Sequence, residues 1–499
     1  MTGTAMLHDL LDRAAERWPE RPAVSASGRT LRYGELAAAS VGVARWLAAA
    51  GVRRGDRVVS VAPSGVALVT LVYAAARLGA AFVVLHEQVR GAPLEHVLAD
   101  CEPALLVTDD VANLAAARRR GIATRDLAQV PLAAEPAPAP ADPGAGPIAV
   151  DPVCLIYTSG TTSLPKAVVS THAQVVFAAT AIQSVLRYRP DDTVYCPLPL
   201  SFDYGLYQVF LGALSGAHVW LGQPAEVGPS LLRNLVRTGA TVLPAVPAVA
   251  DALARLLGRP GAAVPSLRLL TNTGAAMPPE PLAALRARIP GLRVQLMFGL
   301  TECKRATVNP PDADLARPGS CGRALPGTEV YVVDDAGRRL PPGEVGEVVV
   351  RGPHVMAGYW RRPELTAQRF PRREGLFPEL HTGDYGWLDA EQYLYFAGRR
   401  DDIYKERGFR VSATEVEAAA RRVPGVRQAV VLPPAGAVPA ALLAVTDLTA
   451  DEVLAGMREQ VEEFKIPQRC LVLPDLPLTP NGKVDRRTLA ARLGEAPHA

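Results

Sequence analysis

The chain of 499 residues has few of the features that mark membrane, secreted or nucleic-acid-binding proteins. No segment offers about 18 uninterrupted apolar residues, so we expect no membrane span. Residues 1–22 mix acids and bases and lack the basic start and apolar centre of a signal peptide. Positive charge is not in excess, because 53 Lys and Arg face 50 Asp and Glu. Without a basic run or a basic–aromatic patch, we do not expect binding to nucleic acid.

Cysteine and histidine are also scarce, with six and eight copies. The cysteines are scattered without a CxxC pair, and the histidines form no HExxH or similar ligand spacing. These absences argue against a disulfide framework and against a structural zinc site. A reduced, cytoplasmic protein is the simplest expectation.

What the chain does contain is an alternation of helical patterns with short valine-rich runs, over residues 36–85 and again from 151 to about 260. This alternation predicts an α/β fold of mostly parallel sheets covered by helices. Residues 326–352 carry short alternating strands joined by DAG and PPGE turns, which predicts a small β-rich subdomain. The Pro/Ala-rich residues 133–149 are expected to form an exposed connector.

The length of the chain exceeds one ordinary core, so two or more domains are expected. Near residues 398–402 the charged sequence GRRDD follows a strand-like run, and the remaining residues, about 95, suffice for a small α+β domain. In that part we predict a helix, two strands and a second helix, over residues 413–423, 428–434, 441–447 and 448–464. The predicted domains are residues 1–400 and residues 401–499.

The most informative segment is residues 157–166, YTSGTTSLPK. Six of its ten residues are Ser, Thr or Gly, and a lysine closes it. Glycine lets backbone N–H groups turn toward an anion, while hydroxyl groups and lysine supply donors and charge. The apolar residues 153–156 just before it predict a buried strand, so a strand would lead into a phosphate-binding loop. The alternative is a polar surface loop, which the lysine, the strand and the motifs downstream make the weaker interpretation.

Five further segments accompany this loop: GAAMP (274–278), FGLTE (298–302), HTGDYG (381–386), GRRDDIYKERGFR (398–410) and LPLTPNGKVDRR (476–487). Together the six segments resemble the motif set of the adenylate-forming superfamily, which includes acyl-CoA synthetases, peptide-synthetase adenylation domains and luciferases. The resemblance extends over essentially the whole chain. It implies a large N-terminal domain followed by a small, mobile C-terminal domain.

The resemblance also implies a two-step reaction. A carboxylate attacks the α-phosphate of ATP and gives an acyl-adenylate and pyrophosphate. A thiol, from CoA or from the phosphopantetheine of a carrier protein, then attacks the adenylate to form a thioester. ATP and Mg²⁺ are therefore the implied cofactors, and a small carboxylic acid is the implied substrate.

Residues that match the family's phosphate site are concentrated in the loop. The residues expected to hold the β- and γ-phosphates are Thr158, Ser159, Gly160, Thr161, Thr162 and Lys166. Prepositioned donors of this kind stabilise the charge of departing pyrophosphate. Thr301 would contact the α-phosphate, and Glu302 would bind Mg²⁺, which prefers oxygen ligands.

The base and ribose positions are matched by residues from three motifs: Gly274, Ala275, Phe298, Gly299, Asp384 and Arg399. Phe298 would stack on the adenine, with the glycine and alanine of GAAMP on its other face. Asp384 would accept hydrogen bonds from the ribose hydroxyls, and Arg399 would reach ribose or phosphate.

Two residues match positions that, in the family, belong to the mobile C-terminal domain and to its hinge. Lys483 in the PNGK turn would bridge the attacking carboxylate, the ribose oxygen and the α-phosphate, which would lower the repulsion between two anions. Asp401 matches the hinge about which the small domain rotates after adenylation. That rotation would withdraw Lys483 and bring residues 408–412 toward the active site.

The acid pocket is expected near residues 197–210. Asp203 matches the position at which amino-acid-activating relatives place an Asp against the substrate ammonium; alternatively it bonds a hydroxyl or an aniline, or caps a helix. Tyr204 and Tyr207 would give the pocket aromatic walls, which favours a small or aryl acid. The adjacent cations Lys304 and Arg305 would bind a second substrate carboxylate, CoA phosphates or phosphopantetheine; alternatively they are solvated and pair with acids such as Asp312 or Asp314.

The acceptor remains open between CoA and a carrier protein. Residues 405–410, KERGFR, resemble the peptide-synthetase pattern, and no carrier domain is expected after Ala499. The sequence thus predicts a stand-alone acid–thiol ligase of a secondary-metabolite pathway. Two alternatives stay open: an enzyme that adenylates nitrite for transfer to an aryl amine, and a non-catalytic nucleotide-binding regulator.

Overall fold

The structure, a computed structural model, describes residues 6–133, 146–158, 165–372, 377–399, 403–406, 409–434, 439–461, 463–479 and 484–495. The chain divides into two compact units. Unit 1 comprises Met1–Val330 and Val350–Leu380, and unit 2 comprises Tyr331–Val349 and His381–Ala499. The predicted α/β class, with a large part of mostly parallel sheets and a small α+β part, is confirmed.

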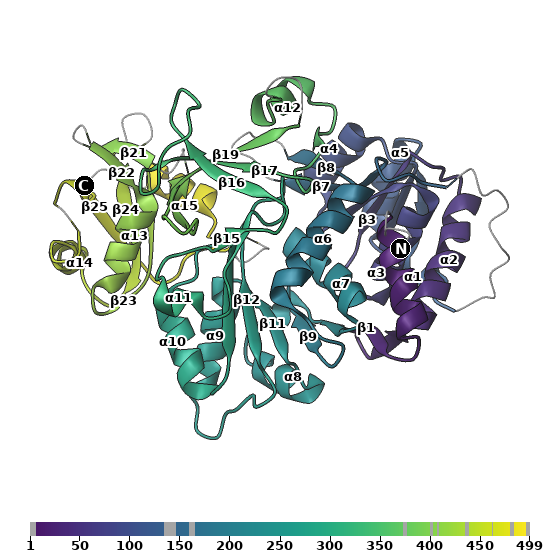
Figure 1. Ribbon diagram of the computed structural model, residues 1–499, viewed down its shortest axis with the longest axis horizontal. Helices are drawn as coiled ribbons and strands as arrows, with labels where there is room; N and C mark the ends of the chain where they lie inside the picture. Colours follow the sequence, from purple (N-terminus) through teal and green to yellow (C-terminus); the bar gives the residue numbers. More distant parts are fainter. Residues whose placement is uncertain are drawn as a thin grey trace. The chain divides into compact units, whose positions relative to one another are not determined.

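Unit 1 contains two large sheets (Figure 1). The seven-stranded sheet has the order β18-β8-β7-β4-β3-β5-β6. Its strands are β3 (Arg57–Val61), β4 (Ala81–Leu85), β5 (Leu105–Thr108), β6 (Ala123–Arg125), β7 (Pro152–Thr158), β8 (Lys166–Thr171) and β18 (Gly358–Tyr359). Strands β3 to β7 pair in parallel, whereas β8 and β18 are antiparallel additions at one edge. The valine-rich runs are buried on both faces, as is usual where helices cover both sides of a parallel sheet.

The nine-stranded sheet has the order β15-β14-β13-β12-β11-β9-β10-β1-β2. Its strands are β1 (Pro22–Ala26), β2 (Arg29–Arg32), β9 (Thr193–Cys196), β10 (His218–Leu221), β11 (Val242–Ala245), β12 (Leu269–Asn272), β13 (Arg293–Phe298), β14 (Thr307–Val308) and β15 (Arg323–Ala324). Strands β1 and β9 to β13 run parallel. The chain after β12 and after β13 therefore leaves the sheet at the same edge, where ligands of open α/β sheets bind.

Helices separate and cover these sheets. They are α1 (Leu7–Arg17), α2 (Tyr33–Ala49), α3 (Val66–Leu78), α4 (Gly91–Cys101), α5 (Val111–Arg119), α6 (His172–Leu186), α7 (Asp203–Ser215), α8 (Leu231–Thr238), α9 (Pro247–Leu257), α10 (Pro279–Arg288), α11 (Ala313–Ala316) and α12 (Pro363–Arg369). Helix α3 packs against β4 of one sheet and β1 of the other and is buried nearly all round, as is α7. A helix that is apolar on every side belongs to a core of this kind.

Unit 2 begins with the predicted β-rich subdomain, which is confirmed as a four-stranded sheet of β16 (Glu329–Val333), β17 (Gly346–Arg351), β19 (Glu379–Leu388) and β20 (Leu394–Arg399). The hairpin β21 (Ile403–Glu406) and β22 (Phe409–Ser412) follows. The three-stranded sheet contains β23 (Val426–Leu432), β24 (Ala441–Thr446) and β25 (Arg469–Leu473), and the helices are α13 (Ala413–Arg422), α14 (Ala450–Met457) and α15 (Arg486–Glu495).

The predicted elements of the C-terminal part are confirmed with one correction. The helix predicted over residues 448–464 is wrong in length, because α14 ends at Met457. Gly456 lies in its last turn, and glycine is a poor helix former. The predicted domain boundary at 400–401 lies outside the described residues, and so do residues 134–145 of the connector predicted over residues 133–149, so both stay predictions.

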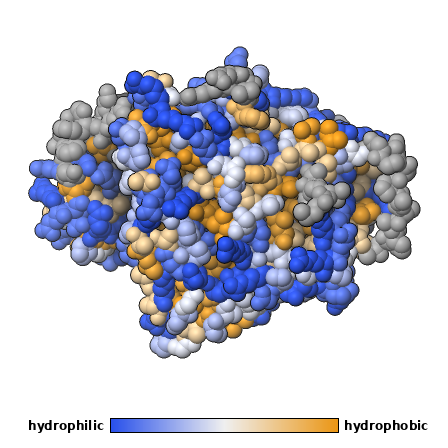
Figure 2. All heavy atoms as spheres, viewed as in Figure 1, coloured by the Kyte–Doolittle hydropathy of each residue, from blue (hydrophilic) through white to orange (hydrophobic). Residues whose placement is uncertain are grey.

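On the face shown in Figure 2, hydrophobic residues lie between hydrophilic ones. This is usual, since apolar atoms contribute much of any folded surface. Among the described helices, none has both the length and the hydropathy needed to span a bilayer.

Candidate active site

The two stems of the predicted phosphate loop are held by one helix. Strand β7 ends at Thr158 and β8 begins at Lys166, and these two residues are register partners. On α4, His96 Nε2–H donates to the carbonyl oxygen of Pro165 (2.8 Å), and Asp100 accepts a hydrogen bond from the Tyr157 hydroxyl (2.8 Å). The loop residues Ser159, Gly160, Thr161 and Thr162 lie outside the described residues, so their phosphate contacts stay predictions.

The structure brings Lys166 and Glu302 to the same tyrosine. The Tyr359 hydroxyl donates to Glu302 Oε1 (2.7 Å), and the Lys166 ammonium lies 4.0 Å from the centroid of the Tyr359 ring. Burial, together with the nearby Glu302 charge, raises the pKa of Tyr359, so its hydroxyl remains a donor. Sequence analysis missed this residue, because a tyrosine after a glycine carries no distinctive signal.

The turn after β13 shapes the next group of predicted residues. The carbonyl oxygen of Leu300 accepts hydrogen bonds from the N–H groups of Cys303 (3.0 Å) and Lys304 (2.7 Å). Lys304 has a φ of 62°, in the left-handed region that non-glycine residues rarely adopt. A Cβ added at Gly299 would lie 2.2 Å from the Lys304 carbonyl oxygen. The turn therefore has room only for a glycine at position 299.

Replacing Gly299 with alanine is expected to lower the free energy of unfolding by about 3 kcal/mol, the upper range for overpacking. Gly42→Ala is the matched control, because a Cβ at Gly42 in α2 meets nothing within 4 Å. Chemical unfolding of both variants would measure the difference. Equal stability of G299A and G42A would show that the turn opens without cost.

Asp203 is the first residue of α7 and is 5% exposed. Phe202 is the N-cap of that helix, so Asp203 lies inside its first turn, and the suggestion that it caps the helix is wrong. Its carboxylate makes no capping hydrogen bond, and no other hydrogen bond or ion pair of it is found among the described residues. A carboxylate buried in this way favours a cationic ligand.

The two cations after the turn are buried rather than solvated. Lys304 is wholly inaccessible to solvent, and its Nζ has no hydrogen-bond partner among the residues that the structure describes. Arg305 is also buried; it donates to the Lys304 carbonyl oxygen (2.7 Å), and its Nε lacks a partner within the described chain. The suggested pairing with Asp312 or Asp314 is wrong, because Arg286 pairs with both carboxylates (3.1 and 2.8 Å).

Aromatic rings and opposite charges surround these cations. The Lys304 ammonium lies 5.8 Å from the Tyr207 ring centroid, and the Arg305 guanidinium carbon lies 4.8 Å from that of Tyr204. Burial raises the pKa of Tyr207; the Asp203 charge raises it further, whereas the Arg305 charge lowers it. The five predicted substrate residues therefore form one buried cluster of two cations, one carboxylate and two aromatic rings.

The residues predicted to bind the base come from neighbouring parallel strands. Gly274 and Ala275 follow β12, and Phe298 with Gly299 ends β13, so all four lie at one sheet edge. In unit 2, Asp384 and Arg399 are register partners on β19 and β20, and Arg399 Nε lies 3.5 Å from Asp384 Oδ1. Lys483 and Asp401 lie outside the described residues, and nucleotide contacts remain predictions for all of these positions.

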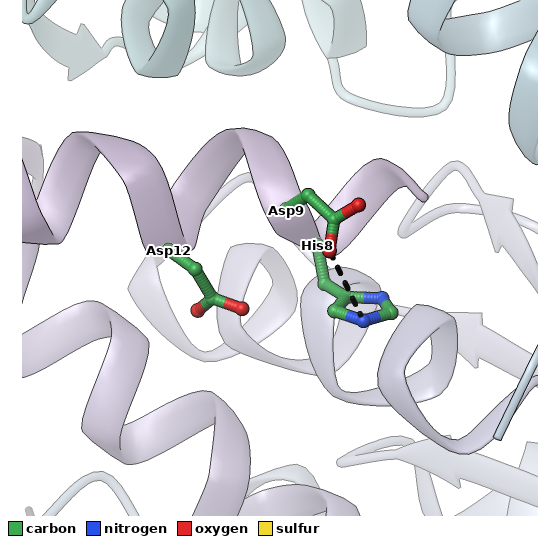
Figure 3. A group of neighbouring side chains, drawn as sticks. All are labelled: His8, Asp9 and Asp12. Carbon is green, nitrogen blue, oxygen red and sulfur yellow. Dashed lines mark ion pairs between the residues drawn. The ribbon is translucent and has the colours of Figure 1, made fainter. Parts of the chain in front are cut away.

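A second group of possible metal ligands lies on α1, where His8, Asp9 and Asp12 approach one another within 4.8 Å (Figure 3). Its carboxylates already have partners. Asp12 forms an ion pair with Arg77, and Asp9 accepts the Met6 N–H (2.9 Å) at the start of the helix. We therefore interpret the group as a polar network that fixes α1.

Comparison with known proteins identifies the chain. The AMP-binding enzyme family matches residues 11–360, and the AMP-binding enzyme C-terminal domain matches residues 415–483. The chain belongs to the AMP-binding enzyme family. The predicted superfamily is thus confirmed, and so is the prediction of an adenylate-forming acid–thiol ligase over a non-catalytic regulator.

Several characterised or solved proteins resemble this AMP-binding enzyme over most of its length. Feruloyl-CoA synthase of an Amycolatopsis species is 32% identical over 497 residues, which cover 97% of this chain and 98% of that protein. ATP-bound MatB from Rhodopseudomonas palustris is 28% identical with a TM-score of 0.86, covering 97% and 98%. VinN is 38% identical with a TM-score of 0.71, covering 79% of this chain and 98% of VinN.

Together these findings give the reaction class: ATP-dependent adenylation of a carboxylic acid followed by thioester formation. A solved relative, an O-succinylbenzoate–CoA synthetase of Bacillus subtilis, binds ATP with a magnesium ion. The residues of this AMP-binding enzyme fit such an ion, because the buried Glu302 offers a carboxylate close to the lysine at the end of the phosphate loop.

Proposed function

We propose that this AMP-binding enzyme adenylates a small amino acid that carries a second carboxylate, such as aspartate. The observation that supports this substrate is the buried cluster of unpaired opposite charges. Asp203 would receive the ammonium, and Lys304 with Arg305 would receive the carboxylate that does not react. The other carboxylate would remain free to attack the α-phosphate of ATP.

Charge pairing is the physical basis of this specificity. Buried charges without partners are costly, so a ligand that brings the matching charges relieves that cost, whereas an uncharged acid does not. The structure of VinN in complex with L-aspartate, from a protein 37% identical to this chain, supports the same class of ligand.

The residues around the nucleotide would perform the adenylation. Lys166 and the phosphate loop would stabilise the charge of the leaving pyrophosphate, and Lys483 would offset the repulsion between the attacking carboxylate and the α-phosphate. Magnesium held by Glu302 would neutralise phosphate charge. The acyl group would then pass to the thiol of CoA or of a separate carrier protein, which suits an enzyme of a biosynthetic pathway.

ATP–pyrophosphate exchange over a matched panel of acids tests the proposal. L-Aspartate is expected to support the fastest exchange, because it presents all three charges. Succinate removes the ammonium, whereas asparagine and isoasparagine each neutralise one carboxylate and thus show which one is activated. Exchange with succinate or ferulate as fast as with aspartate would contradict the proposal, and nitrite-dependent exchange would favour the nitrite alternative.

Asp203→Asn is expected to lower kcat/KM for aspartate about 100-fold, because the asparagine keeps an acceptor oxygen but loses the charge opposite the ammonium. Exchange with succinate, which has no ammonium, should change little. The informative readout is the ratio of the two rates in wild type and variant. An equal loss with both acids would assign Asp203 a structural role.

A further inference from the structure

Thr158 and Lys166, two residues expected to bind phosphate, lie at the loop end of the β7–β8 hairpin, where they are register partners. Pro165, which directly precedes Lys166, is attached to α4, because its carbonyl oxygen accepts a hydrogen bond from His96 Nε2–H (2.8 Å). Pro165 lies beyond the last register pair of the hairpin, and a proline has no backbone N–H to donate. A contact from outside the sheet therefore holds the backbone just before Lys166.

Tyr157, which directly precedes Thr158, is attached to the same helix. Its hydroxyl donates to Asp100 Oδ2 (2.8 Å), and the Cys101 thiol lies beside that hydroxyl. Burial, and then the neighbouring Cys101 and Asp100, raise the pKa of Tyr157, so its hydroxyl stays protonated and remains a donor. His96 is four residues before Asp100, so both side chains project from one face of α4. One helix face thus contacts both strands of the hairpin.

The end of α4 is in turn held by the segment after β18. Arg362 Nη2 donates to Asp100 Oδ1 (3.0 Å), and Trp360 Nε1 donates to the Asp100 carbonyl oxygen (3.1 Å). That carbonyl belongs to the last turn of the helix, where carbonyl groups have no donor within the helix. The Asp100 side chain is 6% exposed, and its two oxygens bond different partners, so the orientation of the carboxylate is fixed. Because β18 pairs with β8, helix, hairpin and following segment hold one another.

Fixed positions matter at a phosphate site, because donors and charges placed in advance need no rearrangement when the anion binds. We propose that three residues, His96, Asp100 and Tyr157, are positioning residues of the ATP site. Their hydrogen bonds hold the ends of β7 and β8 where Thr158 and Lys166 meet the β- and γ-phosphates. This inference rests on the proposed phosphate-binding role of those two residues and not on the identity of the acid.

A comparison of ATP with AMP tests the inference, because AMP lacks the β- and γ-phosphates. His96→Ala removes the donor to Pro165. We expect its affinity for MgATP to fall about tenfold, the upper effect of losing one hydrogen bond, whereas its affinity for AMP should not change. Calorimetric titration with each nucleotide, without acid, measures both affinities. In ATP–pyrophosphate exchange, KM for ATP should rise by a similar factor while KM for the acid stays the same.

His96→Gln keeps a side-chain donor and should restore most of the ATP affinity. Tyr157→Phe breaks the other contact but keeps the ring, and it should also lower ATP affinity about tenfold without changing AMP affinity. Tyr195→Phe is the matched control. In wild type the Tyr195 hydroxyl donates to Glu226 Oε2 (2.5 Å), so the same kind of bond is lost elsewhere in unit 1, and both nucleotide affinities should equal those of wild type. Circular dichroism would verify that each variant is folded.

The inference is overturned if H96A and Y157F bind ATP as tightly as wild type, or if each loses ATP and AMP affinity equally, since the second result would indicate a general structural defect. Failure of H96Q to recover ATP affinity, or an equal loss in Y195F, would also contradict it. Lys166→Ala separates the two levels of the argument. If K166A loses ATP affinity while H96A and Y157F do not, the positioning role alone is rejected. If K166A binds ATP as wild type does, the phosphate assignment falls with it; failure of wild type to exchange with any acid would reject the proposed function.

Discussion

Lys304→Met is expected to lower kcat/KM for aspartate about 1,000-fold while raising the free energy of unfolding by about 2 kcal/mol. Activity falls because a substrate carboxylate would enter the pocket without its buried partner. Stability rises because the Lys304 ammonium is wholly buried and has no hydrogen-bond partner among the described residues, whereas methionine fills a similar volume without charge. Opposite changes in activity and stability are typical of a residue retained for its ligand.

Lys465→Met provides the matched control for this prediction. Lys465 in unit 2 forms an ion pair with Glu415 (2.7 Å), so its loss should leave the acid specificity unchanged. Exchange rates with aspartate, asparagine and isoasparagine would locate the effect of K304M, since only acids with the recognised carboxylate should lose rate. A destabilised K304M protein, or an equal loss with every acid, would show that Lys304 supports the fold instead.

Acidification from pH 7 to pH 5 is expected to lower the free energy of unfolding of unit 1 by about 4 kcal/mol through His172 and His354. His218, whose pKa burial also lowers to about 4, adds a loss of the same kind. Burial lowers the pKa of His172 to about 4 and that of His354 to about 4. In the unfolded chain an imidazole has a pKa of about 6.5, so the unfolded state takes up more protons as the pH falls. The stability contributed by these neutral histidines is therefore fully present above about pH 6.5 and is lost as the pH falls from that value to about 4.

Two substitutions test which histidines cause this loss of stability at low pH. His354→Leu removes a ring whose two nitrogens have no partner within the described chain. His172→Asn keeps an acceptor for the Leu7 N–H, which His172 Nδ1 accepts at 3.0 Å. Each variant should recover about 2 kcal/mol at pH 5. Urea unfolding followed by tryptophan fluorescence at both pH values would measure this, since four of the five tryptophans lie in unit 1.

His381→Asn is the control for this loss of stability at low pH. His381 lies in unit 2, where its side chain forms a hydrogen bond with Glu347. It should leave the acid loss of unit 1 unchanged. If the double variant of His172 and His354 lost as much stability at pH 5 as wild type, other titrating groups would have to account for the acid sensitivity.

Local patterns predicted the elements of this fold and the strand before the phosphate loop. A continuous apolar run suffices to predict β7, and hydrophobic periodicity suffices for α13 and for the β-rich subdomain. The end of α14 was predicted less well; Gly456 lies in its last turn, and glycine is a poor helix former. Motif resemblance supplied the site residues but not their burial.

Contacts between distant residues could not be predicted from local patterns. Adjacent cations such as Lys304 and Arg305 are usually solvated, and only the fold shows that they are buried with Asp203. Tyr359 is 57 residues from Glu302 along the chain. The hydrogen bond between them depends on the pairing of β18, a strand of two residues. A strand this short cannot show a periodic pattern in the sequence.

The attachment of both loop stems to α4 has a consequence for engineering. His96 and Asp100 are one helical turn apart, so one rigid face holds the residues before and after the loop. The end points of the loop are thereby set by a helix that contributes no residue to it. Loop sequences from other members of the family could therefore be grafted between Thr158 and Pro165, because the two contacts with α4 are made by Tyr157 and by the Pro165 carbonyl oxygen, outside the exchanged residues.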